Sequence, residues 1–178
     1  MGYKFNPEGK HINFLINAAL EDKADWIILD DCDCYPNYLV KQDGRKILEN
    51  CEENFVAITR LYLWGEDKHF PRLAQPKEYD FDTLKYIPSL WAWRADLGMI
   101  AREEQIMHYI FQIGGVDQDF KTDVFNLMPP YCLLHKFANP INIDTKLNMY
   151  RDSGLVPGMA HPLEFGGPLE DLPEWAHE

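Results

Sequence analysis

The spacing of apolar residues predicts alternating helices and strands over the first third of the chain. Extended spacing indicates strands at residues 26–29 and 55–59, the second continuing through Leu61 and Leu63. The first strand is expected to be buried, since its four residues are all apolar. Helical spacing indicates helices at residues 38–50 and at an earlier stretch, where five apolar residues share one face: Ile12, Leu15, Ile16, Ala19 and Leu20.

The rest of the chain has a weaker pattern. Residues 68–82 contain two prolines and are expected to form loops and short strands. SLWAWRAD is expected to be extended, with Trp91 and Trp93 on one face and Arg94 opposite. Helices are predicted at residues 99–112, 121–128 and 144–152, and a short strand at 131–135. The tail, residues 155–178, is rich in Pro and Gly and is expected to cover the surface.

These elements predict a single α/β domain over residues 1–178, with a mixed sheet flanked by helices. A chain of this length can bury one core, and hydrophobic and aromatic fractions of 46% and 13% exclude a disordered chain. A net charge of −12 disfavours binding to nucleic acid or anionic membranes. No segment is apolar enough for a membrane span or a signal peptide, so we expect a cytoplasmic protein. The four cysteines lack zinc-site spacing, and free thiols are expected, with a disulfide pair as the alternative.

An acidic triplet follows the first predicted strand. Asp30, Asp31 and Asp33 crowd negative charge at the point where open α/β sheets place their ligands. A divalent cation with oxygen ligands relieves such repulsion most simply, so Asp31 and Asp33 are a candidate metal site. The alternative is an acidic turn exposed to water.

Two stretches carry a resemblance to a known family. The helix that begins near Gly9, followed by ADWIILDDCD, and the later stretch LLHKFANPINIDTKLNMYR resemble the central part of family 2-like glycosyltransferases of the GT-A fold. The resemblance implies a partial GT-A-like, Rossmann-like domain. It also implies that Asp31 and Asp33 bind Mn²⁺ or Mg²⁺ together with the diphosphate of a nucleotide-sugar donor. Asp30 lies beside them, His135 completes the metal coordination, and His161 competes for that role.

The same resemblance suggests roles for other side chains. The acceptor, a glycan or another hydroxyl, needs a base, and Asp119 is the first candidate with Asp117 as the second. For Asp119 a helix cap is the alternative interpretation. Trp91 and Trp93 are candidates to stack on sugars, or they pack in the core. Arg94 is a candidate to hold the donor or acceptor, or it pairs with an acid.

Strands that precede this region in the family have no counterpart in this chain. We therefore expect a fragment, a pocket completed by a second chain, or a reduced domain, and the open sheet edge favours oligomerisation. The alternative enzyme is a haloacid-dehalogenase-type phosphohydrolase with Asp31 as nucleophile, Asp33 as acid/base and Thr59 in its second motif. A catalytically inactive interaction domain is the third hypothesis.

Overall fold

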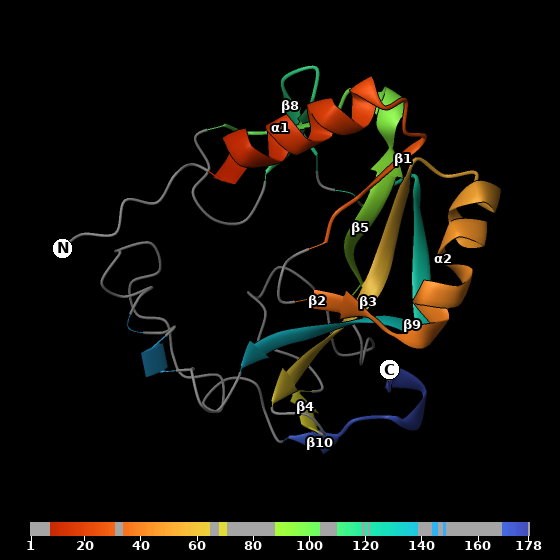
Figure 1. Cartoon of the computed structure of the whole chain (residues 1–178), viewed down its shortest axis with the longest axis vertical. Coiled ribbons are helices and arrows are strands. Elements are labelled where there is room, and N and C mark those ends of the chain that lie inside the picture. The colour runs from red at the N-terminus through yellow and green to blue at the C-terminus, as the bar shows by residue number, and fades with distance from the viewer. Residues whose placement is uncertain are drawn as a thin grey trace.

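The computed structural model describes most of the chain as an α/β fold with a seven-stranded mixed sheet, a three-stranded sheet and two α-helices (Figure 1). No helix in the described part is long and apolar enough to cross a bilayer. The residues described are 8–30, 34–64, 68–70, 88–103, 110–118, 120, 122–138, 144–145, 148 and 169–177.

The main sheet is built around β3, which has neighbours on both sides. Along one side the order is β1, β5, β3, and both of these pairings are antiparallel. On the other side β9 pairs parallel to β3, and β2 pairs antiparallel to β9. It follows that β1, β3 and β9 run in the same direction. The strands are β1 (Trp26–Ile28), β2 (Cys34–Pro36), β3 (Phe55–Trp64), β4 (Lys68–Phe70), β5 (Pro88–Arg94), β9 (Val124–Ala138) and β10 (Glu170–Asp171).

The two helices cover opposite faces of this sheet. Successive side chains of β3 alternate between the faces, as in any strand. Val56 and Ile58 pack against Val40 of α2 (Tyr38–Asn50). Phe55, which points the other way, packs in a cluster with Ile16 of α1 (Glu8–Glu21). The helices predicted around residues 12–20 and 38–50 are therefore confirmed.

The described end of the chain belongs to the core. β10 pairs with β4, which pairs with the end of β3, and a 3₁₀ turn (Glu174–Ala176) follows. Leu172 and Ala176 are buried against Leu61 and Leu63 of β3. These two side chains anchor the surface tail predicted for residues 155–178, and the other described residues between 169 and 177 are exposed or half-buried. Residues 155–168 lie outside the described part.

Among the described strands, β1 is the last of the sheet on its side, and its partial burial corrects the expectation of a buried strand. It pairs with β5 through Trp26–Arg94, Ile27–Trp93 and Ile28–Ala92. Ile27 is buried, but the side chain of Ile28 remains 50% exposed. The apolar run predicted the strand correctly, but such a run does not indicate where a strand lies within its sheet.

The helix predicted at residues 99–112 was wrong. Its two described ends form strands β6 (Ile100–Ala101) and β7 (Phe111–Ile113), which pair antiparallel, while residues 104–109 lie outside the described part. β7 then turns into β8 (Val116–Asp117) through Gly114 and Gly115, whose φ angles of 58° and 82° suit a hairpin. The same two glycines are also compatible with a helix stop, which explains the error.

The short helix predicted at residues 121–128 was also wrong, because Val124 begins the long strand β9. Its register with β3 shifts from Ile58–Leu127 to Thr59–Cys132, so residues 128–131 have no partner on β3. Pro129 and Pro130 lack an N–H and fit this interruption of the ladder. Figure 1 shows β9 bending toward β2 along its length. The strand predicted at 131–135 is part of β9. Of the helix predicted at 144–152, Asp144, Thr145 and Asn148 are described and helical.

A β-bulge separates the two tryptophans of β5. Val56 pairs with Ala92 but Ala57 pairs with Leu90, so Trp91 is an extra residue in β5. As a result Trp91 packs on the α2 side of the sheet and Trp93 on the α1 side. The expectation that both rings share one face was wrong. After β5 the chain forms a 3₁₀ turn (Ala95–Leu97) that leads into β6.

Candidate functional site

The pairing of β2 with β9 fixes the position of His135. Cys34 lies directly opposite His135 in this antiparallel pair. Directly opposed residues have Cα atoms about 4.5–5.5 Å apart and side chains on the same face. Cys34 follows Asp33 in the sequence. The fold therefore brings the candidate histidine, about a hundred residues away along the chain, opposite the residue next to the candidate metal motif.

A tyrosine extends this row across the sheet. His135 is also the register partner of Tyr62 on β3, and the centroids of their rings lie 5.0 Å apart at an interplanar angle of 48°. Cys34, His135 and Tyr62 thus share one face across three strands. The packed ring of Tyr62 restricts the orientation of the imidazole, which is half-buried.

Of the three acidic residues of the motif, the structure describes Asp30. Asp30 is exposed at the end of β1. Asp31 and Asp33, the candidate base Asp119 and the competing ligand His161 lie outside the described residues. Among the residues that the structure describes, no group of three His, Cys, Asp or Glu side chains is arranged to hold a metal ion. The donor types of the proposed set, carboxylate and imidazole, suit Mn²⁺, while Mg²⁺ prefers oxygen alone.

The two candidate sugar-stacking residues are buried. Trp93 is 1% exposed and lies against Phe111, with ring centroids 5.1 Å apart. This places Trp93 in the core below α1, with no ring face presented to a ligand. Trp91 is 5% exposed, and part of its surface lines a groove described below. The structure thus favours core packing for both rings.

Two contacts hold the side chain of Arg94, the last residue of β5. Its guanidinium donates a hydrogen bond to the backbone carbonyl of Cys51. It also lies over the ring of Trp26, with Cζ 4.4 Å from the ring centroid, a cation–π contact. Both contacts order the Arg94 side chain beside β1, and β1 is the strand that precedes the acidic motif.

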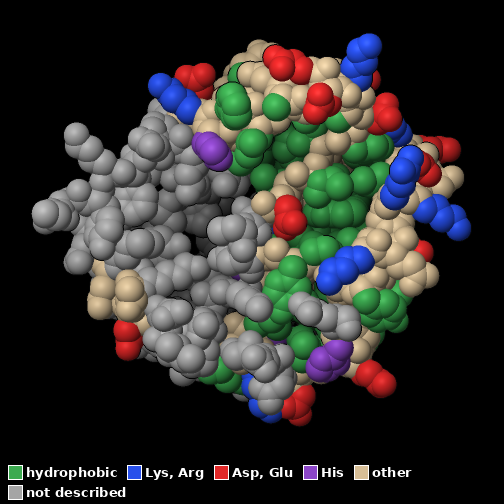
Figure 2. All heavy atoms as spheres, viewed as in Figure 1, with side chains coloured by type: hydrophobic (Ala, Val, Ile, Leu, Met, Phe, Trp, Pro, Cys, Tyr) green, Lys and Arg blue, Asp and Glu red, His purple; other side chains and the backbone are tan. Residues whose placement is uncertain are grey.

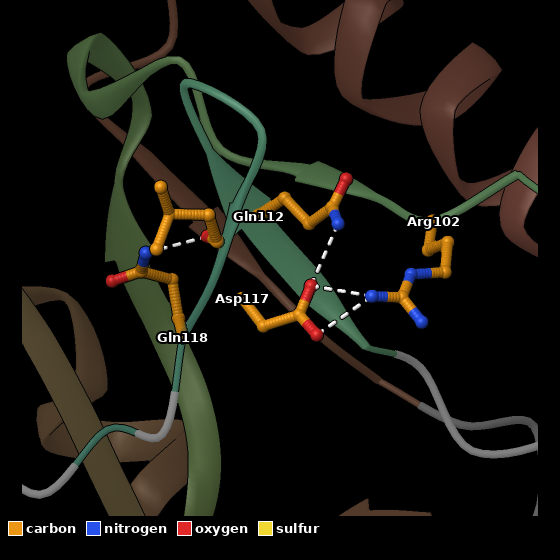
Figure 3. A network of polar contacts seen from close by, with 5 residues as sticks. Arg102, Gln112, Asp117 and Gln118 are labelled. Atoms are coloured by element: carbon orange, nitrogen blue, oxygen red, sulfur yellow. Dashed lines mark hydrogen bonds and ion pairs between the residues drawn. The ribbon is translucent and has the colours of Figure 1, made fainter.

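Asp117, the second candidate base, lies in the small sheet (Figure 3). Its carboxylate accepts hydrogen bonds from Gln112 at 2.6 Å and from Arg102 at 2.8 and 2.6 Å. These bonds, that of Gln112 first and then the ion pair with Arg102, lower the pKa of Asp117. A carboxylate with a lowered pKa is a weaker proton acceptor. The arrangement fits a role in holding the β7–β8 hairpin in place.

A groove lies between β1 and α2. It has a volume of about 460 Å³, and its apolar walls include Trp26 and Ile28 of β1, Val40 and Leu48 of α2, and Trp91. Figure 2 shows hydrophobic side chains gathered on this face between α1 and α2. Asp30 lies at its rim, so the groove adjoins the end of the strand that carries the candidate motif.

Asn37 is a key residue that the sequence interpretation missed. Its side-chain oxygen accepts a hydrogen bond from Val40 N at 3.2 Å and caps α2. Its amide nitrogen donates to the carbonyls of Pro130 at 2.8 Å and Trp175 at 3.0 Å. Asn37 is fully buried, and it joins α2, β9 and the final turn immediately after β2. An Asn directly before an amphipathic helix is a recognisable capping signal.

No family model, curated protein or solved structure matches this chain. The interpretation of function therefore depends on the residues themselves and on their arrangement in the fold.

Proposed function

We propose that this chain takes part in metal-dependent sugar transfer from a nucleotide-diphosphate donor to an acceptor hydroxyl. The observation that carries this proposal is the register of β2 and β9, which sets His135 opposite Cys34, the neighbour of Asp33. Asp31, Asp33 and His135 are the proposed ligands. A bound Mn²⁺ or Mg²⁺ supplies Lewis-acid stabilisation of the departing diphosphate.

The acidic motif follows the carboxyl end of β1, and in open α/β sheets ligands bind at the carboxyl ends of the strands. By register, Ile28 at that end is level with Val56 and Phe125, whereas His135 is level with Tyr62, six residues further along β3. Residues 29–33 lead in sequence from β1 to Cys34, the register partner of His135. The proton of the acceptor hydroxyl passes to a carboxylate base, for which Asp119 remains the candidate.

The alternative phosphohydrolase has less support. It requires Thr59 near the end of a strand, where its hydroxyl can reach a phosphate. Thr59 instead lies within β3, which continues to Trp64, and it is fully buried. A catalytically inactive interaction domain remains the competing hypothesis, and binding of metal and donor separates the two.

The proposal is tested by calorimetric titration of Mn²⁺, and then of UDP and GDP, into the wild-type chain. Three variants follow: Asp31→Ala/Asp33→Ala, His135→Gln and, as a matched control for the histidine, His177→Gln. His177 is exposed near the end of the chain and is not part of the proposed site. Asp171→Asn, on β10, is the matched control for the loss of an acidic charge.

Support would be Mn²⁺-dependent nucleotide binding that is lost in the double variant, weakened in His135→Gln and unchanged in both controls. Loss of one metal ligand typically lowers affinity by at least about tenfold, as loss of an outer-shell partner already does. Metal binding that survives in the double variant would overturn the ligand assignment. Absence of metal binding in the wild-type chain would favour an inactive domain.

A further inference from the structure

The groove between β1 and α2 has the size and the lining of a small-molecule site. Its volume is about 460 Å³. Ligand pockets in proteins usually have volumes of about 300–1,000 Å³, with mostly apolar walls and a few polar groups. Apolar side chains from β1, α2, β5 and β9 form the walls here, and charged side chains from β1 and α2 and their flanks line the remainder. The groove lies on the face of the molecule that Figure 2 shows.

Gly44 leaves room in this groove on the side of α2. It is buried in the interior of the helix, where glycine is less stable than alanine. Its backbone is helical, so its conformation does not require a glycine. A Cβ atom at this position would lie 3.4 Å from Cη2 of Trp91 and 3.7 Å from Cγ1 of Val40. A larger side chain would therefore fill space beside two residues that line the groove.

Two tryptophans make the groove suitable for an aromatic ring. Trp91 is 5% exposed and packs against α2. Trp26 lies under the guanidinium of Arg94, whose Cζ is 4.4 Å from the centroid of the ring. Both rings are therefore held in place by the protein itself, and walls formed in advance are typical of small-molecule sites. Contacts between aromatic rings are more favourable than their buried area alone predicts, so an aromatic ligand suits these walls better than an aliphatic one.

The charged side chains of the groove indicate an uncharged ligand. Among the described residues that line it, Arg45 is the only cation, and it is ion-paired with Glu49 at 2.8 Å. The other charged residues are Asp25 and Asp30, on a chain whose net charge is −12, so an anion is repelled. Asp30 has an interaction partner within the protein, as Glu49 has, so the lining does not require a cation either.

We infer that this groove binds a small uncharged aromatic molecule. The ligand lies between β1 and α2, against Trp26 and Trp91 and beside Gly44. Burial of its apolar surface drives binding, and the two indole rings favour a flat ring over an alkyl chain. This inference does not rest on the proposed metal site. Binding is therefore expected without a divalent cation, and also in the Asp31→Ala/Asp33→Ala variant.

The test is fluorescence titration of the full chain with N-phenyl-1-naphthylamine, an uncharged aromatic probe that emits strongly only in apolar surroundings. Its analogue 8-anilino-1-naphthalenesulfonate has the same rings and one negative charge. We expect one molecule of the neutral probe to bind per chain, and the sulfonate to bind at least about fivefold more weakly because of like-charge repulsion. 2-Naphthol should displace the neutral probe, and dodecanol, an uncharged aliphatic molecule, should be the weaker competitor.

Substitutions in α2 locate the bound probe. Gly44→Leu fills the groove and is expected to abolish binding. Gln42→Leu adds the same side chain at an exposed position of the same helix, away from the groove, and should bind as the wild-type chain does. Gly44→Ala adds one methyl group and is expected to weaken binding about tenfold. Because alanine also stabilises the helix, weaker binding in Gly44→Ala cannot come from unfolding, and this variant decides the test if Gly44→Leu does not fold.

Several results would overturn the inference. Absence of probe binding by the wild-type chain would mean that the groove is not open to a small molecule. Probe affinity that falls as the protein concentration rises would identify a second copy of the chain as the occupant. Unchanged binding in Gly44→Ala and in folded Gly44→Leu would place the probe elsewhere. Equal binding of the sulfonate would refute the charge argument, and equal competition by dodecanol and 2-naphthol would refute the preference for an aromatic ring.

Discussion

Replacement of Asn37 is expected to be the most destabilising polar substitution in the described part of the chain. The side chain caps α2 through Val40 N and also donates to the carbonyls of Pro130 and Trp175. Asn37→Ala removes the cap, which costs about 1 kcal/mol. It also removes two buried hydrogen bonds at about 1 kcal/mol each and leaves two carbonyls without that donor. The expected loss is about 2–4 kcal/mol of unfolding free energy.

The measurement is thermal and denaturant unfolding followed by circular dichroism. For a chain of this size, the expected loss lowers Tm by about 5–15 °C. Asn50→Ala is the matched control on the same helix, because the Asn50 amide donates only to Lys46 O at an exposed position. This control is expected to change the unfolding free energy by less than about 0.5 kcal/mol.

Asn37→Asp separates the two roles of the side chain. Asp is as good an N-cap as Asn, but it cannot donate to the two carbonyls and it places a charge in a buried site. This variant is therefore expected to be at least as unstable as Asn37→Ala. A nearly neutral Asn37→Asp would refute the reasoning, because it would mean that the cap alone accounts for the effect and that the link to β9 and the final turn contributes nothing.

Four further substitutions or measurements test other parts of the fold. Gly44→Ala is expected to raise Tm by about 2–4 °C, since the added Cβ lies 3.4 Å from Trp91 and alanine favours a helix interior. Gly9→Ala is expected to lower Tm, because its Cβ would lie 2.0 Å from a backbone oxygen. The folded-state pKa of Asp117 is lowered, so its contribution to stability is present above the unfolded pKa, about 4, and is lost as pH falls through the folded value. The difference in unfolding free energy between the wild-type chain and Asp117→Asn should therefore disappear in acid. Burial raises the pKa of the Cys132 thiol to about 12, and in the native chain mass mapping should show it alkylated about a thousandfold more slowly at pH 8 than an unperturbed thiol.

Two elements, α2 and β3, were predicted correctly because their own residues carry the signal for them. α2 has both a capping residue, Asn37, and apolar residues at helical spacing, and its predicted bounds agree with the structure. β3 has a continuous run of apolar and β-branched residues and was also recognised. In both elements the sequence pattern and the tertiary packing favour the same structure.

Elements that depend on distant partners were not predictable in this way. Ile100 and Ala101 have apolar neighbours compatible with a helix, but the Asn13 amide of α1 bonds the backbone of Ala101 on both sides, at 2.8 and 2.7 Å, and holds it extended. The first residues of β9 become a strand through parallel pairing with β3, which lies far away in sequence. The bulge at Trp91 likewise follows from the register of two strands.

In the candidate site, too, some features could be predicted from neighbouring residues and others depend on the fold. The acidic motif is a local signal and was identified from the sequence, although Asp31 and Asp33 lie outside the described residues. The position of His135 opposite Cys34 is a property of the sheet, and from the sequence it was only implied by a resemblance. Asn37 carries its cap as a local signal, but its bonds to Pro130 and Trp175 span 93 and 138 residues and required the fold.

In the proposed site a divalent metal binds next to His135. The most direct measurement is a Mn²⁺ titration followed by NMR of the histidine ring protons, because a bound paramagnetic ion broadens signals close to it. We expect the ring signals of His135 and the neighbouring Tyr62 to broaden first in the wild-type chain, ahead of those of His177, and this selectivity to disappear in Asp31→Ala/Asp33→Ala. Broadening that is equal for His135 and His177, or that persists in the double variant, would contradict it.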